Sequence, residues 1–121
     1  MSSILPLKIH IENLRLRTII GFNPEERKHR QDVIINIHFT YDASDVCRTD
    51  NPDDCVDYKT LKYRIIKHVE ESSYSTLEYL AKKLLDIVME PPLILSAAVK
   101  AEKPNALRYA DSVSVLVEAK R

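Results

Sequence analysis

The sequence predicts an α+β domain with the element order ββααββ, in which a four-stranded antiparallel sheet carries two helices on one face. Two observations predict this fold class. Apolar and polar residues alternate in two runs near the N-terminus and in two more near the C-terminus, as they do in half-buried strands. Between these runs, two segments repeat their apolar residues with the period of a helix. A chain of 121 residues is expected to form one domain over residues 1–121.

The first two strands are expected to pair as a long antiparallel hairpin. Alternation over residues 5–11 slips by one position and resumes over residues 14–16. This slip predicts a β-bulge near Glu12-Asn13. A polar loop over residues 22–31 then leads to the clearest alternating run of the chain, residues 33–41.

Two helices are expected in the middle of the chain, after a turn-rich linker over residues 42–54. Apolar residues from Tyr58 to Val69 recur at helical spacing, and Asp57 is a plausible N-cap. A second helix is expected to begin at Ser75 and to stop before Pro91-Pro92. The third and fourth strands are expected over residues 95–101 and 113–119.

The composition excludes several classes of function. The 18 basic and 18 acidic side chains balance, which argues against general nucleic-acid binding but not against a local anion pocket. No apolar run approaches the roughly 20 residues that cross a bilayer. The N-terminus lacks the features of a signal peptide, so a cytoplasmic location is expected. Cys47 and Cys55 form no CxxC pair, and neither a disulfide scaffold nor a metal site is expected.

The turn over residues 103–111 is unusually rich in ionisable groups. Lys103, Arg108, Tyr109 and Asp111 all lie in it, between two apolar strands. It is either a solvated Pro-Asn turn or a binding loop held by the sheet. Gly21 is the only glycine of the chain, so it is expected to meet a special backbone requirement.

Other candidate residues each allow two interpretations. Glu78 either completes a capping box with Ser75 or accepts hydrogen bonds from a planar amidine-like ligand group. Tyr58 either joins the apolar face of its helix or stacks on a heterocycle and handles a proton. Glu25, Glu26 and the basic residues 27–30 form either a solvated loop or a cluster that attracts a phosphorylated substrate.

The open sheet has two unpaired edges, and its outer strands carry no obvious string of protective lysines or prolines. We therefore expect neighbouring subunits to cover these edges in a homo-oligomer.

Four stretches, taken in order, resemble the dihydroneopterin aldolase family. They are Gly21-(x)4-Glu26…Gln31, Val56-Asp57-Tyr58, Leu77-Glu78-Tyr79-Leu80-Ala81 and Lys103-Pro104. The resemblance extends from about Ile9 to Val117. It implies the tunnelling fold (T-fold), in which ring-shaped oligomers stack into an octamer of two tetrameric rings with sites between subunits.

The resemblance also implies roles for individual residues. Glu78 and the Leu77 backbone would hold the aminopyrimidinone edge of a pterin, while Tyr58 and the Val56 backbone would come from the adjacent subunit. Lys103 would be the main proton carrier, and Glu26 would help to position and polarise it. No cofactor and no metal would be needed, because the pterin N5=C6 imine itself accepts electrons when the C1′–C2′ bond breaks.

Two segments resemble the branch of the family that comprises dihydroneopterin triphosphate 2′-epimerases. They are residues 13–18 and, more closely, residues 106–114. This branch inverts C2′ by retro-aldol cleavage and re-addition. Arg108, with Arg15 or Arg17, is a candidate for binding the phosphates. The alternatives are a dihydroneopterin aldolase, which releases the aldehyde, and a non-catalytic pterin-binding protein of the same fold.

Overall fold

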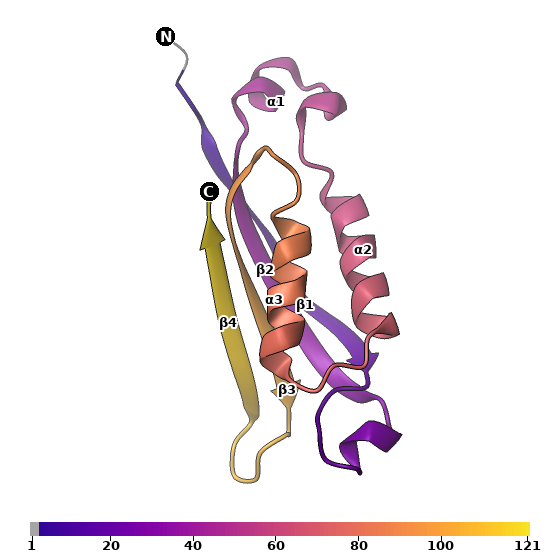
Figure 1. Cartoon of the computed structure of the whole chain (residues 1–121). Coiled ribbons are helices and arrows are strands. Elements are labelled where there is room, and N and C mark those ends of the chain that lie inside the picture. The colour runs from indigo at the N-terminus through magenta and orange to yellow at the C-terminus, as the bar shows by residue number, and fades with distance from the viewer. Residues whose placement is uncertain (1–2) are drawn as a thin grey trace.

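The structure, a computed structural model, describes residues 3–121. It contains a four-stranded antiparallel sheet with the strand order β1-β2-β3-β4. The strands are β1 (Pro6–Thr18), β2 (Gln31–Asp42), β3 (Ile94–Pro104) and β4 (Ser112–Lys120). Helices α2 (Tyr58–Glu71) and α3 (Leu77–Val88) lie side by side over one face of the sheet (Figure 1). The predicted ββααββ order is therefore confirmed.

The predicted β-bulge in β1 is also confirmed. The register with β2 shifts between Ile11 and Leu14, and Asn13 adopts a positive φ of 54°. The Asn13 amide donates to the side chain of Asn36 at 2.8 Å. Because of the shift, apolar side chains on both sides of the bulge face the helices.

The hydrophobic core lies between this sheet face and the two helices. Strand β2 forms its centre, with Val33, Ile35, Ile37 and Phe39 at most 1% exposed. Leu80 and Leu84 of α3 are completely buried against it, as are Ile65 and Val69 of α2. The packed core joins the sheet and the two helices into two rigid layers, and the loops described below lie at the two ends of these layers.

Two local predictions were wrong. The linker over residues 42–54 contains a short helix, α1 (Ser44–Thr49), and a 3-10 turn, η2 (Pro52–Asp54). Six residues are too few to show an apolar period, and this helix has no buried residue. The second long helix begins at Leu77 rather than Ser75, because Thr76 is its N-cap and accepts from the Tyr79 amide at 3.1 Å.

No helix within residues 3–121 is long and apolar enough to span a bilayer.

Candidate active site

An ion pair between Lys103 and Glu26 marks the candidate active site. Lys103 Nζ donates to Glu26 Oε2 at 2.8 Å, and the two side chains are 13% and 26% exposed. Lys103 lies near the end of β3, opposite Val113 of β4. Glu26 opens the short 3-10 helix η1 (Glu26–Lys28) in the loop between β1 and β2. The sheet thus brings together two ionisable groups that are 77 residues apart in the sequence.

The loop around Glu26 holds its carboxylate in a defined place. Asn23 Oδ1 accepts from the Glu26 amide at 2.9 Å, and the Asn23 amide donates to Glu26 Oε1 at 3.4 Å. The hydrogen bond from Lys103 is the largest cause that lowers the pKa of Glu26 below its ordinary value. The backbone N–H groups of the loop also lower this pKa, whereas partial burial raises it. Glu26 is therefore a carboxylate at neutral pH and accepts the hydrogen bond that Lys103 Nζ donates.

Gly21, the single glycine of the sequence, meets the special backbone requirement that the sequence predicts. Its φ is +124°, a conformation that side chains disfavour. A Cβ at this position would lie 2.4 Å from Glu26 Cδ. The glycine thus leaves the space that the Glu26 carboxylate occupies beside the loop backbone.

The start of α3 lies at the same end of the molecule as the end of β3 and the loop between β1 and β2, and Leu77 and Glu78 are part of it (Figure 1). They are the first two residues of α3, where backbone N–H groups lack intrahelical partners. The Glu78 side chain is exposed, and the capping-box alternative is wrong because Thr76, not Ser75, caps the helix. At this helix start the Glu78 carboxylate can accept hydrogen bonds from an amidine-like edge of a ligand. The backbone N–H groups can donate hydrogen bonds to an acceptor that neighbours this edge.

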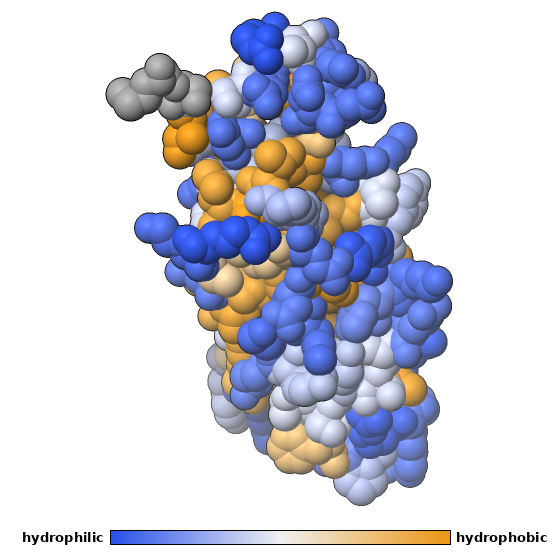
Figure 2. Space-filling model, turned by 45° about the horizontal axis from the view of Figure 1, so that its top comes forward, coloured by the Kyte–Doolittle hydropathy of each residue, from blue (hydrophilic) through white to orange (hydrophobic). Residues whose placement is uncertain are grey.

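The start of α2, where Tyr58 follows Val56 by two residues, lies toward the opposite end of the molecule (Figure 1). Asp57 caps α2 between them, as predicted, by accepting from the Lys59 and Thr60 amides. Tyr58 is 58% exposed, so it does not belong to the core. Both residues line a depression of about 630 Å³ between the start of α2 and His10 and Ile11 of β1. Figure 2 brings this end toward the viewer and shows apolar surface among its hydrophilic side chains.

The distance between the two ends can be gauged along β2. Glu102, the neighbour of Lys103, pairs with Ile34, whereas Tyr41, near the other end of the strand, has the Val56 backbone beside its hydroxyl. Seven residues of a strand rise about 23 Å. A small substrate therefore cannot reach Lys103 and Tyr58 of the same subunit.

The candidate phosphate ligands differ in how free they are. Arg108 is exposed in the β3–β4 hairpin and stacks over the exposed ring of Tyr109, with 5.3 Å between the guanidinium carbon and the ring centroid. Arg17 is already paired with Asp32 at 3.3 Å and donates to the Arg30 carbonyl at 3.0 Å. Arg15 is exposed on β1. Of the first two, Arg108 is the more available for an anion.

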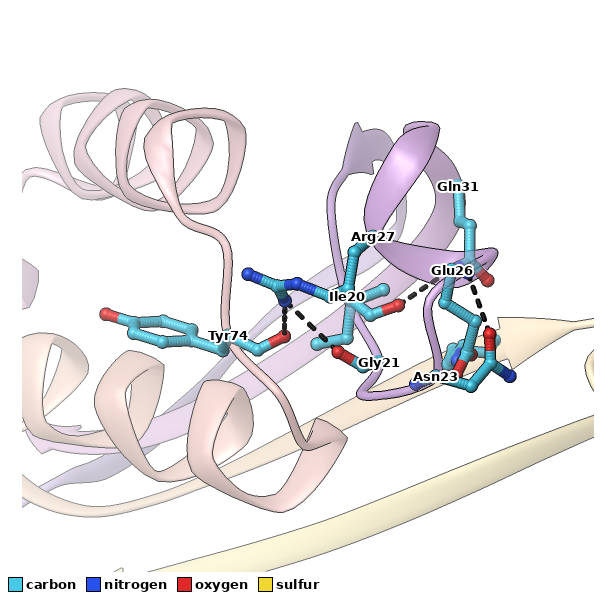
Figure 3. Close-up of polar contacts among 8 residues, drawn as sticks. Ile20, Gly21, Asn23, Glu26, Arg27, Gln31 and Tyr74 are labelled. Atoms are coloured by element: carbon cyan, nitrogen blue, oxygen red, sulfur yellow. Dashed lines mark hydrogen bonds and ion pairs between the residues drawn. The ribbon is translucent and has the colours of Figure 1, made fainter.

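Within the basic run over residues 27–30, Arg27 and Arg30 form hydrogen bonds to backbone carbonyls of the protein itself. Arg27 donates to the carbonyls of Gly21, Ser73 and Tyr74, and Arg30 donates to those of Arg17 and Glu70. Gln31 donates to the Ile20 carbonyl at 2.6 Å (Figure 3). These side chains bind the loop to the rest of the protein. The sequence contains no signal for these contacts, because all but one of the bonded carbonyls lie more than ten residues away.

Comparison with known proteins agrees with this architecture. The chain is 40% identical over 114 residues to the dihydroneopterin triphosphate 2′-epimerase of Pseudomonas aeruginosa, covering 94% of this chain and 93% of that one. It is 42% identical over 113 residues to the epimerase of Escherichia coli K12, covering 93% and 94%. A dihydroneopterin aldolase of Escherichia coli K12 is 24% identical over 110 residues, covering 91% and 90%.

Solved structures show the same fold. The dihydroneopterin aldolase of Escherichia coli in complex with neopterin superposes with a TM-score of 0.87 at 24% identity, covering 93% of this chain and 97% of that one. A dihydroneopterin aldolase from Burkholderia thailendensis bound to guanine gives a TM-score of 0.83 at 20% identity, covering 96% and 92%. The predicted T-fold is thereby confirmed. Since the dihydroneopterin aldolase family also matches residues 9–118 of the sequence, the chain belongs to that family.

Proposed function

We propose that this protein is a dihydroneopterin triphosphate 2′-epimerase, which converts its substrate into dihydromonapterin triphosphate. The observation that carries the proposal is the largely buried Lys103–Glu26 pair, at 2.8 Å, which joins the end of β3 to the loop between β1 and β2. Such a pair supplies a positioned proton carrier for acid–base chemistry. The choice of epimerase over aldolase is supported by relatives at 40% and 42% identity that are epimerases, against 24% for the aldolase.

The proposed reaction breaks and remakes one carbon–carbon bond. Removal of the C2′ hydroxyl proton turns C2′ into an aldehyde carbon, and the electrons of the C1′–C2′ bond pass to N5, which takes up a proton. The resulting enamine then adds to the other face of the aldehyde, and the two protons return. The pterin imine is the electron sink, so neither a Schiff base with Lys103 nor a metal is required.

Two groups must exchange protons with the substrate, and Lys103 and Tyr58 are our candidates. Each such transfer contributes about 10²–10⁴-fold to a rate. Glu26 is proposed to orient Lys103 and to stabilise its charge, and the support is their 2.8 Å contact. Glu78 and the Leu77 backbone are proposed to bind the pterin edge, and Val56 is proposed to add a backbone contact.

We propose that each site is formed by two subunits, in an octamer of two tetrameric rings. The support is the placement of Glu78 and Lys103 at one end of the subunit and of Tyr58 at the other. The edge strands β1 and β4 offer free backbone groups for closing a ring. The octamer and a cytoplasmic location both stay predictions.

Subunit mixing tests the shared site. Tyr58→Ala and Glu78→Ala proteins are each expected to be nearly inactive. Unfolded together and refolded at equal amounts, they should recover about a quarter of the wild-type activity, because one site in four would combine two intact halves. A mixture as inactive as its components would contradict the shared site, provided that size-exclusion chromatography shows reassembly.

A product assay tests the reaction. The protein is incubated with dihydroneopterin triphosphate, and separately with dihydroneopterin, and the dephosphorylated, oxidised products are resolved by chromatography. Monapterin formed mainly from the triphosphate is the expected result. Hydroxymethylpterin formed mainly from the free compound would identify an aldolase instead, and binding without turnover would identify a pterin-binding protein.

We further propose that Arg108 binds the phosphates of the substrate, with Arg15 as a second candidate. The support is its exposure in the hairpin that directly follows Lys103. Arg108→Ala should reduce kcat/KM for the triphosphate by about 10-fold or more, since charged hydrogen bonds contribute about 1.5–3 kcal/mol, and should leave that for dihydroneopterin nearly unchanged. Equal losses for both substrates would contradict this role.

A further inference from the structure

The guanidinium of Arg27 joins two segments that carry different parts of the candidate site. Nη1 donates to the carbonyl oxygens of Gly21 and Tyr74, both at 3.1 Å, and Nη2 donates to that of Ser73 at 2.8 Å. The Gly21 amide donates to the same Tyr74 carbonyl at 3.2 Å. Figure 3 shows Arg27 reaching from the loop that contains Glu26 toward Gly21 and Tyr74. Three carbonyls from two segments thus converge on one planar donor group.

The segment around Gly21 and the segment around Tyr74 each lie close to a residue that the proposed reaction uses. On one side, Gly21 borders the Glu26 carboxylate so closely that a Cβ would overlap it. On the other side, Tyr74 lies three residues before Leu77, the first residue of α3. The relative position of the loop and the helix start therefore depends on the group that bonds them to each other.

We propose that Arg27 is a positioning residue that sets the place of the Glu26–Lys103 pair relative to the pterin-binding start of α3. This inference rests on the proposed function. Arg27 touches no reacting atom in the proposed reaction. Instead, Arg27 acts by holding Gly21 and Tyr74 at a fixed separation. Its rigid fork suits three simultaneous acceptors, whereas a lysine ammonium on a flexible stem would hold them less tightly.

Arg30 provides a matched control. It also bonds two backbone carbonyls, those of Arg17 at 3.3 Å and Glu70 at 3.0 Å. These bonds fasten the same loop to the end of β1 and the end of α2. None of them involves Gly21 or the segment that leads into α3. A purely structural role would therefore make Arg27 and Arg30 variants equivalent.

The test compares Arg27→Met, Arg27→Lys and Arg30→Met in kcat, KM and chemical denaturation. Arg27→Met should lower kcat by about 10–100-fold, with a smaller change in KM, because small misplacements of catalytic groups cost about that much. Arg27→Lys should recover part of the loss. Arg30→Met should lose stability but keep kcat within about 2-fold. A wild-type kcat in Arg27→Met, or an equal loss in Arg30→Met, would overturn the proposal.

A second measurement does not depend on turnover. In ¹³C NMR titrations, the pKa of Glu26 should rise toward its ordinary value in Arg27→Met, because the contact with Lys103 loosens, and should not change in Arg30→Met. An unchanged Glu26 pKa in Arg27→Met would overturn the inference. If the wild-type protein turns over no pterin, the proposed function fails, and the titration alone decides whether Arg27 positions Glu26.

Discussion

Replacing Gly21 with alanine tests the link between backbone geometry and catalysis most directly. The added methyl group meets two obstacles. The φ of +124° is strained for any residue with a Cβ, and the Cβ itself would lie 2.4–2.5 Å from the carboxyl atoms of Glu26. The first obstacle acts on folding, and the second acts on the Lys103–Glu26 pair.

The structure gives the size of each effect. A sparsely populated backbone conformation costs about 1–3 kcal/mol in free energy of unfolding. Ordinary carbon–carbon contacts are about 3.5–4.0 Å long, so the carboxyl group must retreat by roughly 1 Å. The end of a glutamate side chain moves at little energetic cost, but this movement would break the 2.8 Å contact with Lys103. A misplacement of about 1 Å can cost about 100-fold in rate.

The assay is a double-mutant cycle with Glu26→Ala, read by kcat/KM and by urea denaturation at a fixed protein concentration. Gly21→Ala should lower kcat/KM by about 100-fold when Glu26 is present, but by little when Glu26 is already alanine. The loss of stability should be similar in both backgrounds, because the backbone strain remains. Equal catalytic losses in both backgrounds, or a Gly21→Ala protein with wild-type kcat/KM, would refute the reasoning.

Three further predictions concern proton transfer, pH and helix capping. Lys103→Met should lose at least about 100-fold in kcat while neopterin binding, measured by calorimetry, persists; lost binding would instead indicate a structural role. Because Lys103 lowers the pKa of Glu26, their pairing stabilises the protein fully above the ordinary Glu26 value of 4.5 and less as the pH falls through the lower, folded value. The difference in unfolding free energy between wild type and Glu26→Gln should therefore shrink below pH 4.5, and a constant difference in urea titrations would contradict the pairing. Asp57→Ala should lower the free energy of unfolding in the same assay, since two amides lose their acceptor, and no loss would contradict the cap.

Local features of the sequence were sufficient for most of the fold. Alternation and helical periodicity identified all four strands and both long helices, because each element must bury one face against the core. The slip at Glu12-Asn13 predicted the bulge, and Asp57 was recognisable as a cap from its position before the helix. Helix α1 was missed because it has only six residues and none of them is fully buried.

Periodicity did not reveal which residues meet in space. That Thr76 rather than Ser75 caps α3 depends on backbone dihedral angles at adjacent positions, and either side chain can serve as a cap. The sequence placed Arg27 either in a solvated loop or in a cluster that attracts a phosphorylated substrate. Its actual partners were not predictable, because the carbonyls of Ser73 and Tyr74 that it bonds are 46 and 47 residues away. The resemblance to a family suggested roles for Glu26 and Lys103, but their 2.8 Å contact appears only in the folded chain.

The sequence by itself therefore determined the elements, their order and the need for a glycine at position 21, since these depend on side-chain type, period and backbone freedom along the chain. The tertiary structure decided the site. Pairing of β2 with β3 brings Lys103 to the end of the sheet where the Glu26 loop lies, and the length of β2 keeps Tyr58 at the far end. Distances between residues far apart in sequence are set by strand register and packing, which no local pattern encodes.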